Sequence, residues 1–289
     1  MEKIAVLDIG SNSVRLLLAD GEREEQLLET TRLGQGVDKR RLEEAAVART
    51  VEAIERFCAR ARQWGAVRIV AFATSAVRDA ENRDVLLDAL LARCGLRVEV
   101  VPGEKEAQLA YLGAAEGRRA LVLDIGGAST ELVAGEGKVE RAASLQVGAV
   151  RLLNRFGQDR AAATAFLDEL FAAWRDEFDG FAGALCLGVG GTITTLAAME
   201  QRLAAYDPRR VHGYVLTRAA VRAWVDEMWD LPAQARVFPG LTRQRADIIA
   251  HGALILERFQ GAFGQNAVCA SVGDNLRGYW LFAQGAVHV

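Results

Sequence analysis

The sequence has 289 residues, of which 51% are hydrophobic and 25% charged, and this length favours two domains over one. A net charge of −3 argues against a general nucleic-acid-binding protein, and four scattered cysteines without a CxxC pair argue against a zinc ribbon or a disulfide framework. Neither a secretory leader nor an apolar run of the roughly 20 residues needed to span a bilayer is apparent, so we expect a cytoplasmic protein without membrane contact.

An internal repeat organises the chain. Residues 6–16 read VLDIGSNSVRL and residues 122–132 read VLDIGGASTEL, with seven identities in eleven positions. In each copy an apolar run leads through Asp-Ile-Gly and small polar residues into a second apolar run, which predicts a β-hairpin. Small residues in such a turn let backbone N–H groups approach an anion. The turns are therefore candidate phosphate-binding loops, formed by Gly10, Ser11, Asn12 and Ser13 and by Gly126, Gly127, Ala128 and Ser129.

Helical and strand-like patterns alternate along the rest of the chain. Between the hairpins, helices are predicted over 47–58, 85–94 and 104–115 and strands over 67–72 and 96–101. After the second hairpin come predicted helices over 149–155 and 161–178 and a strand over 184–187, which enters a third glycine-rich turn at 188–192. Helices are expected to dominate from there onward. This order predicts an α/β fold with two similar domains, residues 1–118 and 119–289, facing an interdomain cleft. We expect a hinge at 117–120 and a last helix able to pack back on the first domain.

Seven motifs in one order carry a resemblance to a known family. They are DIGSNSVRL, ATSAVRDAEN (73–82), PGEKEAQLAYLG (102–113), DIGGASTEL, GVGGTITTLAAM (188–199), VHGYVLT (211–217) and QRADIIAHG (244–252). Together they resemble the exopolyphosphatase/guanosine pentaphosphate phosphatase (Ppx/GppA) family, short two-domain form, of the actin-like ATPase superfamily. The resemblance implies two actin-like (ribonuclease H-like) α/β domains. The chain departs from the family at Gln108, where arginine is usual, and at residues 275–278, where Asn-Leu-Arg-Gly replaces Gly-Leu-Arg-Glu-Gly.

The resemblance also implies an activity. A hydrolase of this family releases orthophosphate from the terminal phosphoanhydride bonds of inorganic polyphosphate, and guanosine pentaphosphate, a nucleotide of the stringent response, is the alternative substrate. Glu106 matches the family's catalytic carboxylate, which activates water. The competing interpretation places Glu106 on a solvated helix face beside Glu104 and Lys105.

Two further carboxylates precede the hairpin turns. Asp8 and Asp124 lie where strand ends commonly hold Mg²⁺ or Mn²⁺ against substrate phosphates, although each could instead cap an Asx turn. Glu131 occupies the repeat position that Arg15 holds in the first copy. This difference suits a water- or metal-organising role on one side and an anion contact on the other. We expect Glu106, Asp124 and Glu131 to be catalytic and Asp8 and Asp124 to hold the metal.

Three arginines within family motifs could contact phosphate oxygens: Arg15, Arg78 and Arg245. Surface salt bridges are the alternative interpretation. The third glycine-rich turn adds Gly190, Gly191 and Thr192 as a further candidate loop. His212 and His251 are expected to be structural, because no nucleophile motif accompanies them.

Three rival functions remain open at this point. They are preference for guanosine pentaphosphate over polyphosphate, a small-molecule kinase on the same scaffold, and a non-catalytic sensor of guanosine tetraphosphate or polyphosphate. The expected partners are these phosphate compounds, without nucleic acid or membrane, and a homodimer is compatible with the sequence.

Overall fold

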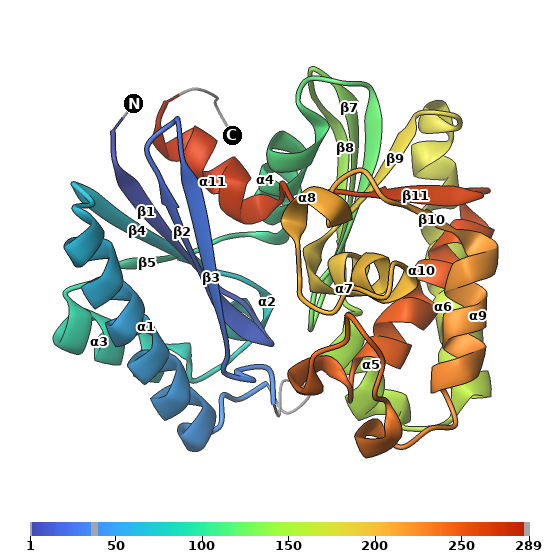
Figure 1. The fold of residues 1–289 in the computed structure, drawn as a ribbon, viewed down its shortest axis with the longest axis horizontal. Coiled ribbons are helices and arrows are strands. Elements are labelled where there is room, and N and C mark those ends of the chain that lie inside the picture. Colours follow the sequence, from blue (N-terminus) through green and yellow to red (C-terminus); the bar gives the residue numbers. More distant parts are fainter. Residues whose placement is uncertain (1, 36–39, 286–289) are drawn as a thin grey trace.

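The computed structural model describes residues 2–35 and 40–285, and in it two mixed β-sheets lie side by side (Figure 1). The first sheet has the strand order β3-β2-β1-β4-β5. Strands β1 to β3 are antiparallel neighbours, whereas β1, β4 and β5 run parallel. The strands are β1 (Ile4–Ile9), β2 (Ser13–Ala19), β3 (Glu24–Thr30), β4 (Arg68–Ala73) and β5 (Val98–Val100).

The second sheet repeats this design and adds one edge strand. Its order is β10-β11-β9-β6-β7-β8, in which β6 to β8 form the antiparallel part, β6, β9 and β11 run parallel, and β10 pairs antiparallel with β11. The strands are β6 (Ala120–Ile125), β7 (Thr130–Glu136), β8 (Lys138–Leu145), β9 (Leu185–Val189), β10 (Val215–Thr217) and β11 (Ala267–Ala270). Both predicted hairpins are therefore present as β1–β2 and β6–β7.

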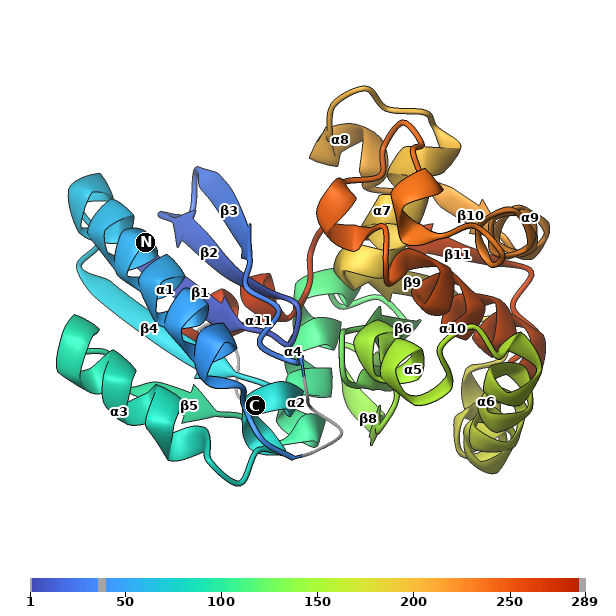
Figure 2. The same ribbon diagram turned by 90° about the horizontal axis from the view of Figure 1, so that it is seen from below.

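Helices cover both faces of each sheet. On the first sheet, α1 (Glu44–Trp64) and α3 (Arg83–Cys94) cover one face and α11 (Asn275–Ala283) covers the other. On the second sheet, α4 (Gly103–Ala115) covers one face. The opposite face carries α5 (Ala149–Phe156), α6 (Arg160–Arg175), α7 (Gly190–Glu200), α9 (Arg218–Met228) and α10 (Ile249–Ala262). Of the two single-turn helices, α2 (Ser75–Arg78) lies beside α4 at the junction of the two halves, and α8 (Pro208–Val211) lies beyond α7 at the end of the second half (Figure 2).

Helices α4 and α11 pack closely against each other between the two sheets (Figure 2). A Cβ atom on Gly113 would lie 1.9 Å from the carbonyl oxygen of Asp274, and one on Gly278 would lie 1.9 Å from that of Leu109. Only glycine permits such an approach, because real Cβ atoms do not come this near to backbone oxygens. The chain leaves α4 through Glu116 and Gly117, both with positive φ, at the position predicted for the hinge.

The two-domain α/β fold is confirmed, with local corrections. Helix α4 precedes the predicted boundary at 118/119 but packs on the second sheet, and α11 packs on the first sheet, so the boundary stays a prediction. The edge strands β3 and β8 were not predicted, nor were the short strands β10 and β11, which lie among the helices that dominate after residue 192 as expected. The third glycine-rich segment is the end of β9 and the first turn of α7. Among the described residues, no helix is long and apolar enough to cross a membrane.

Candidate active site

The tips of the two repeated hairpins touch at the junction of the halves. In each copy the glycine after Asp-Ile donates its N–H to the serine carbonyl three residues later, at 3.1 Å for Gly10 and 3.0 Å for Gly126. A Cβ atom on Gly127 would lie 2.9 Å from the Cβ of Ser11 and 3.5 Å from the backbone nitrogen of Asn12. Two loops with the same turn, one from each sheet, therefore face each other at contact distance.

Each hairpin places a carboxylate opposite a different partner. Asp8 in β1 is in register with Arg15 in β2, and Asp124 in β6 is in register with Glu131 in β7. Arg15 donates to Asp8 and also to Asp274, which precedes α11. The first hairpin therefore carries an ion pair, whereas the second carries two acidic side chains on neighbouring strands.

The acidic pair of the second hairpin is buried and tends to stay protonated. Burial, together with the charge of Asp274, raises the pKa of Asp124 to about 8, against a lowering effect of Arg15. Burial also raises the pKa of Glu131 well above its ordinary value, and the charges of Glu106 and Asp124 add to this. The Ser144 hydroxyl donates to Glu131 at 2.8 Å. Carboxyl groups this close resist simultaneous ionisation unless a cation joins them.

Glu106 lies in the first turn of α4 with its side chain turned into the junction. It is 5% exposed, whereas Glu104 is exposed, so the solvated-face interpretation of Glu106 is wrong. The Arg78 guanidinium donates to its carboxylate at 2.8 Å and to the Val101 carbonyl at 3.1 Å. Burial raises the pKa of Glu106 to about 7, partly offset by Arg78 and reinforced by Asp8. A carboxyl group with this pKa suits proton transfer near neutral pH.

The third glycine-rich segment lies against the Asp124 carboxylate and the Arg245 guanidinium. A Cβ atom on Gly190, whose φ is +83°, would lie 2.4 Å from Oδ1 of Asp124. A Cβ atom on Gly191 would lie 2.1 Å from Nη2 of Arg245. Burial and the neighbouring Arg15 charge lower the pKa of Arg245 to about 10, and no carboxylate of residues 2–35 or 40–285 forms a salt bridge with it. Thr192 instead packs against Gly252 of α10.

The structure thus gathers most of the predicted site residues but leaves their roles as predictions. It brings Asp8, Arg15, Arg78, Glu106, Asp124, Glu131, Gly190, Gly191 and Arg245 together with both hairpin tips. Sequence reasoning missed Asp274, Asp79, Arg151 and Tyr206. The Asp274 side chain caps α11 by accepting from the Leu276 N–H at 3.0 Å, and an Asp before a predicted helix could have signalled it.

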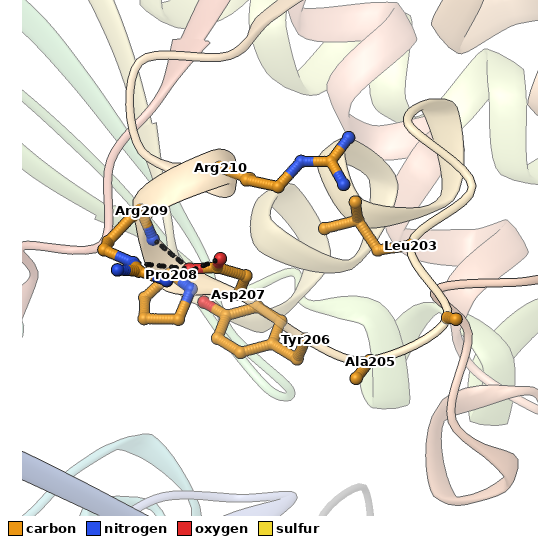
Figure 3. A pocket seen from close by; sticks show the side chains of 8 residues that line it. Leu203, Ala205, Tyr206, Asp207, Pro208, Arg209 and Arg210 are labelled. Carbon is orange, nitrogen blue, oxygen red and sulfur yellow. Dashed lines mark hydrogen bonds and ion pairs between the residues drawn. The ribbon is translucent and has the colours of Figure 1, made fainter.

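A shallow depression of about 630 Å³ lies between the end of α7 and α8 (Figure 3). Tyr206 is 56% exposed on it, and Asp207 accepts from both the backbone and the side chain of Arg209. The pKa of Tyr206 is raised by burial of its hydroxyl and by the charge of Asp274, while Arg245 acts in the opposite sense. This segment lies at the rim of the junction.

The donor set determines what kind of metal ion the junction could hold. Within the described residues no group of three or more His, Cys, Asp or Glu side chains is arranged to enclose an ion. However, Oδ1 of Asp8 is buried and has no hydrogen-bond partner among those residues, and Asp124 faces a second acid. One or two carboxylates completed by phosphate and water oxygens are how proteins usually hold Mg²⁺. The residues therefore fit an ion that arrives with phosphate, not a dedicated protein cage.

Two similar sheets with paired hairpin loops, buried acids and arginines at their junction define an actin-like α/β enzyme. The family model described as "Ppx/GppA phosphatase family" matches residues 6–274, so the chain belongs to the Ppx/GppA phosphatase family. It is 35% identical to "Exopolyphosphatase 2" of Mycobacterium tuberculosis, with 89% of each chain covered. It is 31% identical to "Guanosine-5'-triphosphate,3'-diphosphate pyrophosphatase" of Photobacterium profundum, over 66% of this chain and 42% of the relative.

A solved structure agrees with this assignment. The crystal structure of the Aquifex aeolicus Ppx/GppA family member is 30% identical and matches with a TM-score of 0.79 over 100% of this chain and 99% of that one. The chain spans less than half the length of some curated relatives, at 45% and 42%. The predicted family and fold are thereby confirmed.

Proposed function

We propose that the protein hydrolyses the terminal phosphoanhydride bond of inorganic polyphosphate and releases orthophosphate. The observation that carries this proposal is the position of buried Glu106 beside Arg78 at the place where two like hairpin loops meet. Small-residue loops can bind phosphate oxygens through backbone N–H groups, while a base and a cation beside them serve the hydrolysis step.

Glu106 orients and deprotonates the attacking water. As the water oxygen bonds to the terminal phosphorus, the bridging oxygen leaves with the shortened chain, and the proton passes to the Glu106 carboxylate. Arg78 holds that carboxylate and, through Nη2, which has no partner among the described residues, is able to reach a phosphoryl oxygen. A pKa of about 7 lets Glu106 take up and release a proton within each cycle near neutral pH.

Mg²⁺ or Mn²⁺ is the proposed cofactor, held by Asp124 and by the free oxygen of Asp8. When bound, such an ion neutralises phosphate charge in the transition state. Glu131 is proposed to organise water beside Asp124, since it faces this residue across the hairpin. Backbone N–H groups of both hairpin turns and of Gly190–Gly191 would line the path of the phosphate chain.

Guanosine pentaphosphate is a second candidate substrate, and the rim of the junction favours it. Tyr206 presents an exposed ring there, and Arg245 lies beside Gly191 without an acidic partner in the described part of the chain. An aromatic ring and a cation next to a phosphate site suit a nucleoside that carries several phosphates. The pyrophosphatase name of one relative is consistent with this alternative.

Phosphate release separates these proposals. The wild-type chain is assayed with long-chain polyphosphate and with guanosine pentaphosphate at matched concentrations of terminal phosphate, with and without Mg²⁺. Release from polyphosphate at the higher kcat/KM supports the first proposal, and release from guanosine pentaphosphate at the higher kcat/KM supports the second. Saturable binding without release of phosphate would make the protein a sensor and refute both.

A further inference from the structure

The second hairpin loop is held in place by the start of α5. Backbone N–H groups of Ala149 and Val150 donate to the carbonyls of Gly126 and Gly127, at 3.0 and 2.8 Å. Arg151 adds its own backbone N–H to Gly127 at 3.0 Å and its side-chain Nε to the Ala128 carbonyl at 2.7 Å. Three successive loop carbonyls therefore depend on this end of α5, and Arg151 is the only described residue whose side chain holds the loop's carbonyls.

The other end of the Arg151 side chain reaches the first half of the molecule. Its Nη2 donates to Oδ2 of Asp79 at 2.7 Å, and Asp79 is the C-terminal capping residue of α2. The preceding residue, Arg78, lies 3.9 Å from Asp79 through Nε and donates to Glu106 through Nη1 at 2.8 Å. One line of contacts thus runs from the second hairpin loop through Arg151 and Asp79 to the carboxylate of Glu106.

This ion pair is shielded from solvent, unlike most of those on the surface. The side chains of Arg151 and Asp79 are 17% and 22% exposed. Partly buried pairs are screened less by salt than exposed ones and hold their geometry better. The pair can therefore fix the position of one half against the other.

We propose that Arg151 and Asp79 are positioning residues that align the second phosphate loop with Glu106. This inference rests on the proposed role of Glu106 as the base. Arg151 fixes the position of the Ala128 carbonyl, and Asp79 fixes the position of the Arg78 guanidinium. Because the two residues are paired, the bound phosphate and the attacking water are held in line. Without the pair, α5 still holds the loop through backbone hydrogen bonds and Arg78 still holds Glu106, but no side-chain contact fixes the loop relative to Glu106. A displacement of about 1 Å at this point can slow the chemical step about 100-fold.

The test uses a double-mutant cycle with long-chain polyphosphate as the substrate. Asp79→Asn keeps the side-chain shape and Arg151→Gln removes the guanidinium, and each is expected to lower kcat about 10–100-fold while KM changes less than about threefold. The double variant is expected to be no slower than the slower single variant, because both remove the same contact. Arg151→Lys retains one charged contact and is expected to recover part of the lost kcat. Melting temperatures are measured for every variant, so that loss of folding is seen directly.

A second bridge between the halves supplies a matched control. Arg32 pairs with Asp247 at 3.0 Å, with side chains 47% and 32% exposed, and this pair contacts neither the Ala128 carbonyl nor Glu106. Asp247→Asn is expected to change kcat less than about threefold. Equal losses of kcat for Asp247→Asn and Asp79→Asn would mean that the two bridges matter alike, with no special alignment role for Asp79, and would overturn the inference. Additive losses in the cycle would also overturn it. Failure of the proposed function is distinct, since the wild-type chain would then release no phosphate.

Discussion

Replacing Glu106 with glutamine removes a buried charge but keeps the shape of the side chain. The amide oxygen of glutamine can still accept from Arg78, which now donates to the carboxylate at 2.8 Å. The variant should therefore fold in the same way and bind polyphosphate. Without a base for the attacking water, its kcat is expected to fall about 10²–10⁴-fold, with little change in KM.

The same substitution should make the protein more stable, by an amount that depends on pH. The Glu106 pKa is raised from 4.5 to about 7, so the folded state resists an ionisation that the unfolded state undergoes readily. The free energy of unfolding of the wild type is therefore unaffected by Glu106 ionisation below pH 4.5, and it decreases as the pH rises from 4.5 through 7. The glutamine variant does not show this decrease. At about 1.4 kcal/mol per pH unit, the difference between the two pKa values corresponds to about 3 kcal/mol in favour of the variant above pH 7.

Thermal unfolding between pH 4 and pH 8 without divalent metal measures this effect. The melting temperatures of wild type and Glu106→Gln should coincide near pH 4 and differ by several degrees at pH 8, at roughly 2–4 °C per kcal/mol. Glu104→Gln is the control, because Glu104 is exposed one half-turn away on the same helix, and it should change neither kcat nor this pH dependence. A constant stability difference at all pH values would refute the buried-charge reasoning. Normal turnover by Glu106→Gln would show that another group is the base.

Three further predictions concern metal and substrate binding. EDTA should abolish phosphate release and added Mg²⁺ or Mn²⁺ should restore it, whereas full activity in metal-free buffer would mean that arginines and backbone N–H groups suffice. Arg15→Ala and Arg245→Ala should weaken guanosine tetraphosphate binding more than long polyphosphate binding in calorimetry, and equal losses would indicate general phosphate contacts. Arg15→Ala should also lower the melting temperature, because it leaves the buried carboxylates of Asp8 and Asp274 without their partner. Gly127→Ala places a Cβ atom 2.9 Å from the Ser11 side chain and should raise KM by separating the loops, so an unchanged KM would show that substrate binding does not need this contact.

The fold was predictable where local sequence dictates it. The duplicated Asp-Ile-Gly segments specify two hairpins by themselves, because apolar strands and small turn residues follow each other directly. Strand β3 was missed since its residues are mostly exposed at a sheet edge and alternate too weakly to stand out. Strands β10 and β11 are three and four residues long, and they depend on contacts distant in sequence, because β11 pairs with β9 and β10 pairs with β11.

The site was predictable as a set of residues but not as a set of contacts. The motifs marked Glu106, Asp124 and Arg78, yet no pattern indicates that Glu106 is buried against Arg78 or that Arg15 is shared with Asp274. The contact of Arg15 with Asp274 joins residues 259 positions apart, next to the glycine contacts through which α4 and α11 pack between the sheets. The Arg151–Asp79 pair joins the halves in the same way, over 72 positions.

The duplication and its one asymmetric position together explain how a symmetric scaffold can perform a directional reaction. Both hairpins place an aspartate near the end of the first strand, so Asp8 and Asp124 occupy equivalent positions in the two sheets. In the first, Arg15 neutralises Asp8; in the second, Glu131 faces Asp124 and leaves charge to be neutralised by protons or by a cation. In the proposed mechanism the first hairpin contacts phosphate through Arg15 and shares the metal ion through the free oxygen of Asp8, whereas the second hairpin needs that ion to balance its two acids. Since Glu106 lies close enough to the second pair to raise the pKa of both acids, the water it activates would be on the metal side of the phosphate.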